Sequence, residues 1–117
     1  MIQITESNVT IMISDMDASI AFYEQLGFTL KQRWDNHYAM ISATGITIGL
    51  HPKEASGPVS NSGTVSIGLM VDSIDEAKTL LDNHGIKYKA EDGGSGNYVH
   101  FKDLDGTILY YVQPKWR

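Results

Sequence analysis

The fold is decided by the stretch VTIMISDMDASIAFYEQLGF, residues 9–28. Apolar side chains alternate with others from Val9 to Ile13, which predicts a strand. Ser14 to Asp17 then offer side-chain oxygens to the free amides of a helix start. Apolar residues with helical spacing follow, and Gly27 is a typical helix end because a positive φ costs glycine little. The residues of that apolar face are Met16, Ile20, Tyr23 and Leu26.

The same pattern returns in the second half of the chain. TVSIGLMV, residues 64–71, reads as a strand, and Ser73 to Glu76 form a capping-box sequence. Ile74, Ala77, Leu80 and Leu81 make the apolar face of the helix expected there. Aligning Asp15 with Ser73 brings Gly27 onto Gly85 to within a residue, so the chain is predicted to be a tandem repeat.

Each repeat continues with three short strands. The predicted strands are 28–34, 38–42 and 46–50 in the first repeat, and 86–90, 97–103 and 107–113 in the second. A Pro-, Gly- and Ser-rich linker at about 52–63 separates module 1, about 1–52, from module 2, about 64–117. We expect one α+β domain of two tandem βαβββ modules. They should form a curved eight-stranded mixed sheet with a concave cleft and the helices on its outer face.

Composition narrows the function. The net charge is −5 and basic residues do not cluster, which argues against a nucleic-acid partner. No apolar run approaches the ~20 residues that span a bilayer, and no leader precedes the first strand, so we expect no membrane partner. With no cysteine, the chain offers no disulfide, thiolate zinc site or cysteine nucleophile, which favours the cytoplasm.

Two motifs resemble the vicinal oxygen chelate superfamily, which includes glyoxalase I, bleomycin-resistance proteins and extradiol dioxygenases. They are S-D-x-x-x-S-x-x-F-Y-x-x-L-G-F at residues 14–28 and D-x-D-G at residues 103–106, where Leu104 replaces the usual proline. Enzymes of the group hold a divalent metal at four strand positions. The resemblance carries these positions to Asn8, Gly49, Ser66 and Tyr110. None of the four residues is a usual ligand. Neutral oxygens without a carboxylate bind divalent ions poorly, so we expect no metal and no cofactor.

Alternation along the strands extends this face. Thr10, His51, Gly68 and Val112 should share it, and so should Tyr98 and His100. The resulting candidates for ligand binding are Asn8, Thr10, Arg33, Trp34, Gly49, His51, Ser66, Tyr98, His100 and Tyr110.

Several of these candidates keep a structural alternative. His100 is the leading functional candidate and, with Tyr110, a candidate acid–base group, but a packed and satisfied histidine is the other reading. His51 could line the cleft or cap a strand. Arg33 and Trp34 could clamp a flat or anionic ligand, or Trp34 could belong to a core or dimer interface. Residues 93–97, GGSGN, could form a lid or a hairpin connection.

The resemblance to the bleomycin-resistance branch implies a homodimer that binds a small organic molecule, such as an antibiotic or metabolite, by sequestration. Two alternatives remain open. One is a lyase, isomerase or dioxygenase-like enzyme of the same superfamily that uses His100 and Tyr110 or an unrecognised metal. The other is a protein-binding or regulatory module.

Overall fold

A computed structural model of the chain describes residues 2–52 and 65–115. The first half contains β1 (Val9–Ile13), α1 (Met16–Leu26), β2 (Thr29–Trp34), β3 (Tyr38–Ala43) and β4 (Ile46–Pro52). The second half contains β5 (Ser66–Met70), α2 (Ile74–Asn83), β6 (Tyr88–Gly93), β7 (Gly96–Lys102) and β8 (Ile108–Pro114). The predicted order of elements is confirmed in both halves.

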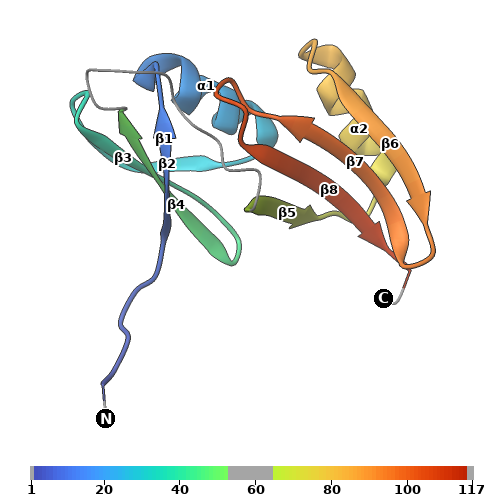
Figure 1. Cartoon of the computed structure of the whole chain (residues 1–117), viewed down its shortest axis with the longest axis horizontal. Helices are drawn as coiled ribbons and strands as arrows, with labels where there is room; N and C mark the ends of the chain where they lie inside the picture. The colour runs from blue at the N-terminus through green and yellow to red at the C-terminus, as the bar shows by residue number, and fades with distance from the viewer. Residues whose placement is uncertain (1, 53–64, 116–117) are drawn as a thin grey trace. The chain divides into compact units, whose positions relative to one another are not determined.

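The chain divides into two compact units, Met1–Ser60 and Asn61–Arg117. Each unit is one βαβββ module with its own four-stranded sheet, ordered β1-β4-β3-β2 in module 1 and β5-β8-β7-β6 in module 2 (Figure 1). All described pairings lie within a module, so the single eight-stranded sheet stays a prediction. The predicted linker lies outside the described residues, except for Pro52.

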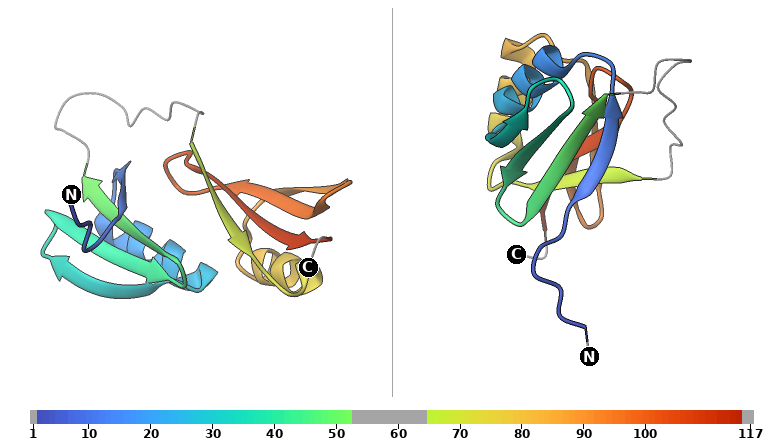
Figure 2. Two further views of the ribbon diagram at one scale, coloured as in Figure 1. Left: turned by 90° about the horizontal axis from the view of Figure 1, so that it is seen from below. Right: turned by 90° about the vertical axis from the view of Figure 1, so that its left-hand side faces the viewer.

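Both sheets have the same mixed pattern. The first strand of each module, β1 or β5, pairs parallel to the last strand, while the remaining neighbours are antiparallel. The helix of each module packs on one face of its own sheet (Figure 2). The other face of each sheet has no helix of its own module over it and is called the open face below.

Local capping explains where the helices begin and end. The Asp15 side chain accepts a hydrogen bond from the Ala18 amide at 3.1 Å, and the Ser73 hydroxyl accepts one from the Glu76 amide at 3.2 Å. Gly27 ends α1 with φ 112°, in the left-handed region that glycine tolerates. Neither of the two described helices is long and apolar enough to cross a membrane.

Burial alternates along the central residues of β7 as predicted. In β7, Val99 and Phe101 are buried on the side of α2, whereas Tyr98 and His100 are partly exposed. The predicted apolar face of α1 is buried in full. Burial of these apolar side chains supplies most of the favourable free energy of folding. It also leaves the polar and aromatic residues of each open face available for other contacts.

The glycine-rich stretch at 93–97 forms a tight connection. Gly93 pairs with Gly96 at the end of the β6–β7 hairpin, so only Gly94 and Ser95 remain in the turn. The interpretation of this stretch as a lid was therefore wrong, and the hairpin alternative is correct. The physical reason is that the two strands continue their pairing through the glycines, which leaves too little chain to cover a site.

Candidate functional site

Three aromatic rings gather on the open face of module 2. Tyr98 and His100 extend from β7, and Tyr110 extends from the neighbouring strand β8, directly opposite His100. The His100 and Tyr98 rings are stacked with centroids 5.7 Å apart and planes 11° apart. The Tyr110 centroid lies 5.7 Å from His100 and 5.9 Å from Tyr98. We call these three residues the ring cluster.

Polar groups border the ring cluster on its β6 side. The Glu91 carboxylate lies 3.5 Å from Nε2 of His100, and the two side chains are 65% and 39% exposed. The Tyr98 hydroxyl is 2.9 Å from Oγ of Ser95. Glu91 was not predicted from the sequence. Its position beside the ring cluster depends on the register of the β6–β7 hairpin, which pairs Glu91 with Tyr98. This arrangement supplies flat surfaces for stacking together with an imidazole and a carboxylate for hydrogen bonds.

Tyr110 occupies space that a neighbouring glycine leaves open. Its ring lies so close to Gly68 of β5 that a Cβ added at Gly68 would overlap it. Ser66, two residues earlier on β5, is exposed. Val112 follows Tyr110 on the same face, but it is only 3% exposed. Val112 therefore contributes little surface to a ligand.

The open face of module 1 centres on Tyr38, a residue that sequence analysis missed. The Tyr38 hydroxyl lies over Gly49, where an added Cβ would overlap it, and is 3.1 Å from Oγ1 of Thr10. Its ring centroid is 5.7 Å from that of Trp34 and 6.3 Å from that of His51. Alternation from the buried Ala39 could have placed Tyr38 on this face, but its position over Gly49 requires the pairing of β3 with β4.

Two further candidates border this face. The Nδ1 atom of His51 is 2.7 Å from the carbonyl oxygen of Pro52; because a carbonyl only accepts, Nδ1 carries the proton in this contact. Asn8 lies directly before β1, not within it as expected, because the parallel pairing with β4 begins at Val9. Oγ1 of Thr10 donates to Oδ1 of Asn8 at 3.5 Å.

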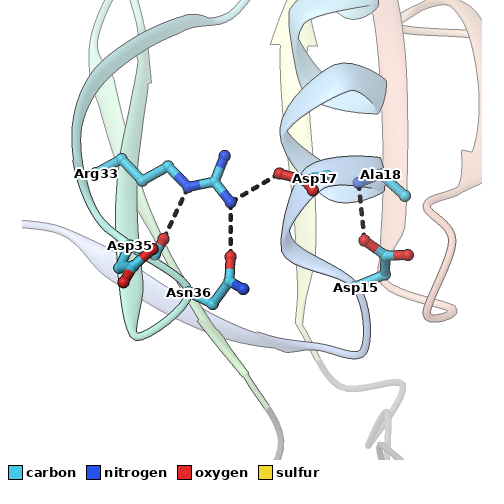
Figure 3. Close-up of polar contacts among 6 residues, drawn as sticks. All are labelled: Asp15, Asp17, Ala18, Arg33, Asp35 and Asn36. Carbon is cyan, nitrogen blue, oxygen red and sulfur yellow. Dashed lines mark hydrogen bonds and ion pairs between the residues drawn. The ribbon is translucent and has the colours of Figure 1, made fainter.

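Arg33 and Trp34 do not form the expected clamp. Arg33 points toward α1, where its guanidinium is 2.7 Å from Asp17 (Figure 3). Trp34 lies beside Tyr38 instead. Arg33 also donates to the Asp35 carbonyl and to Oδ1 of Asn36, both at 2.7 Å. Adjacent residues of a strand point to opposite faces, so the two side chains serve different surfaces.

Replacing Arg33 with glutamine should lower the free energy of unfolding by about 1 kcal/mol, because the Asp17 ion pair and the turn contacts weaken while Asp17 is largely exposed. Chemical denaturation measures this change. Trp34→Ala is the matched control, because Trp34 is 43% exposed and should alter ligand binding more than stability. A ligand affinity lowered by Arg33→Gln at unchanged stability would contradict this assignment.

Among the pockets that the described residues form, one lies in module 1 and another in module 2. The pocket of module 1 has a volume of about 550 Å³. It is lined by Ser7, Asn8, Val9, Lys31, Ser42, Ala43, Gly45, Ile46 and Thr47. The pocket of module 2 has a volume of about 480 Å³ and lies against the start of α2, where Oε1 of Gln113 accepts a hydrogen bond from the Ile74 amide at 2.9 Å.

The four positions matched to family metal ligands carry an amide, no side chain, a hydroxyl and a phenol. Asn8 and Gly49 belong to module 1, Ser66 and Tyr110 to module 2. The Tyr38 hydroxyl and the Tyr110 ring already lie against glycines of these faces. Within residues 2–52 and 65–115, no group of three or more His, Asp or Glu side chains is arranged to hold a metal. This donor set does not fit the family's divalent ion.

The fold and the two motifs match a known family. A model of the "Glyoxalase/Bleomycin resistance protein/Dioxygenase superfamily" matches residues 7–109. The chain belongs to this superfamily. Members of the fold carry out different functions, so the family by itself does not decide between binding and catalysis.

Solved structures with the same fold include binding proteins and an enzyme. TnmS3, an antibiotic-binding protein from Streptomyces sp. CB03234, is 22% identical with a TM-score of 0.71, over 97% of this chain and 100% of the other. A bleomycin-binding protein complexed with bleomycin is 21% identical with a TM-score of 0.67, over 96% and 100%. A lactoylglutathione lyase from Agrobacterium tumefaciens is 17% identical with a TM-score of 0.72, over 93% and 92%.

Proposed function

We propose that this superfamily member binds a small, flat organic molecule at the ring cluster and sequesters it without transforming it. The observation that carries the proposal is the group of three partly exposed rings, Tyr98, His100 and Tyr110, on an open sheet face. Aromatic pairs with centroids about 4.5–7 Å apart are favourable, and such a surface accepts a further ring. The antibiotic-binding and bleomycin-binding neighbours support the same kind of ligand.

We further propose a class of ligand and an oligomeric state for this protein. The ligand is an antibiotic or a metabolite, and binding needs no metal, which the misfit of the four family positions supports. Ser66 borders the ligand on the open face of module 2, and Thr10, Trp34 and His51 are candidate ligand contacts on the open face of module 1. The two modules form one domain, and the chain works as a cytoplasmic homodimer. The dimer is wrong if sedimentation at micromolar concentration finds a single 12.9 kDa species.

A thermal-shift screen of antibiotics, aromatic metabolites and 2-oxo compounds would find the ligand, because a compound at a hundredfold excess over its dissociation constant stabilises the folded state by about 2.7 kcal/mol. Tyr98→Ala should then weaken binding of the hit by about tenfold or more, since it removes a stacking surface. Calorimetric titration measures the affinity.

Tyr88→Ala is the matched control for this substitution. Tyr88 lies on the same sheet but reaches toward α2, where its hydroxyl contacts Asp82 at 3.4 Å. Its loss should leave the affinity unchanged. Equal losses in the two variants would contradict binding at the ring cluster, and so would an absence of any stabilising compound in the screen.

The second candidate is an enzyme in which His100 and Tyr110 act as acid–base groups. It is favoured by the Glu91 carboxylate beside Nε2 of His100, since such a partner can orient an imidazole for proton transfer. The fold shared with a lyase is compatible with this reading. If a screened compound is turned over, His100→Ala should abolish turnover, while His84→Ala, at the end of α2, should not. Stoichiometric metal in protein purified without chelator would instead indicate an unrecognised metal site.

A further inference from the structure

The pocket of module 1 has a chemistry distinct from that of the ring cluster. Its charged side chain is Lys31, and its other polar groups are hydroxyls and the Asn8 amide. Among the residues that the structure describes, no carboxylate lines it. Among residues 2–52 and 65–115, no ion pair includes Lys31. A cationic group surrounded by hydrogen-bond donors, in a chain of net charge −5, is a local exception to the acidic character of the protein.

A strand irregularity positions Lys31. Leu30 pairs with Ile41 and Gln32 pairs with Met40, so Lys31 is the extra residue of a bulge in β2. A bulge redirects side chains and is frequent beside binding sites. Here it brings the Lys31 side chain to the end of the sheet where β3 turns into β4, beside Ser42 and Thr47.

A chain of hydrogen bonds orients the opposite wall. Oγ1 of Thr10 donates to Oδ1 of Asn8, so the Tyr38 hydroxyl must donate to Thr10 in the contact between them. With its oxygen engaged in this way, Asn8 has its NH₂ group left to donate. The pocket thus combines an ammonium group, hydroxyl groups and an amide donor, the set that suits an oxyanion.

We propose that this pocket binds the anionic group of a small organic molecule, a carboxylate or a phosphate, with Lys31 as its counter-ion. This inference concerns module 1 alone and goes beyond binding at the ring cluster. Ser42 and Thr47 hydroxyls and the Asn8 amide supply the remaining hydrogen bonds. Ser42 lies four steps along β3 from Tyr38, about 13 Å at the usual rise of a strand. A molecule that reaches both the pocket and the Trp34–Tyr38 pair therefore needs about that length.

The test titrates the full-length protein with benzoate, phenyl phosphate and benzamide while the backbone amides are followed by NMR. Both anions, or one of them, should shift the amides of Asn8, Ser42 and Thr47 in a saturable way, and the stronger binder identifies carboxylate or phosphate as the preferred group. Benzamide, the neutral analogue of benzoate, should bind at least about tenfold more weakly, and added salt should weaken the anions.

Variants of Lys31 complete the test. Lys31→Met should weaken anion binding by at least about tenfold, Lys31→Arg should retain it, and the control Lys87→Met, at an exposed lysine of module 2, should match the wild type. The proposal fails if neither anion shifts these amides, if benzamide binds as well as benzoate, or if Lys31→Met binds like the wild type. Each outcome is separate from failure at the ring cluster, which is followed through the signals of Tyr98, His100 and Tyr110.

Discussion

Replacing Leu109 with alanine is expected to lower the free energy of unfolding by about 2–5 kcal/mol. Leu109 is completely buried in β8, between Ile67 of β5 and Phe101 of β7, on the face that packs against α2. Truncation removes buried apolar surface and leaves a cavity that the paired strands cannot close. Urea denaturation followed by circular dichroism measures the change.

The same chain offers a matched control. Leu104, in the turn before β8, is 57% exposed, so Leu104→Ala should change the free energy of unfolding by no more than about 0.5 kcal/mol. Similar losses for the two leucine variants would show that β8 does not present Leu109 to the core. Such a result would also argue against the placement of Tyr110 on the open face, because neighbouring residues of a strand point to opposite faces.

Alkaline pH should destabilise the protein through Tyr111. Burial raises the pKa of Tyr111 from 10.0 to about 12. The folded state therefore keeps this phenol protonated at a pH where the unfolded chain releases the proton. The contribution of Tyr111 to stability is fully present below pH 10 and is lost as the pH rises toward 12, by roughly 3 kcal/mol in total.

Tyr111→Phe isolates this effect, because phenylalanine keeps the ring but cannot ionise. The difference in free energy of unfolding between the variant and the wild type should shift steadily in favour of the variant above pH 10. Denaturation at several pH values measures it, and absorbance near 295 nm should show one fewer late-ionising tyrosine in the variant. A difference that stays constant with pH would mean that Tyr111 is not buried on the face of α2.

The two modules share a fold but present different open faces. Module 1 offers Trp34, Tyr38 and a pocket with Lys31, whereas module 2 offers the ring cluster bordered by Glu91. Both modules have what folding requires, namely a capped helix, buried strand residues and an apolar helix face. The open faces can differ because the core does not depend on them.

Much of the fold could be predicted because it depends on local chemistry. The Asp15 and Ser73 caps, the left-handed Gly27 and the alternation around Val99 each act within a few residues, so the sequence shows them directly. The placement of Tyr98, His100 and Tyr110 on one face followed from the same alternation. The repeat then predicted the second module from the first.

What only the tertiary structure decided depends on pairing between distant residues. The register of β3 with β4 places Tyr38 over Gly49, and the register of β6 with β7 brings Glu91 beside His100. The bulge in β2 sends Lys31 into a pocket. The sequence by itself determined the order of the elements, the helix caps and the apolar face of α1, because propensity and periodicity are local. It did not determine which side chains meet, because a shift of one residue in strand register changes every cross-strand neighbour.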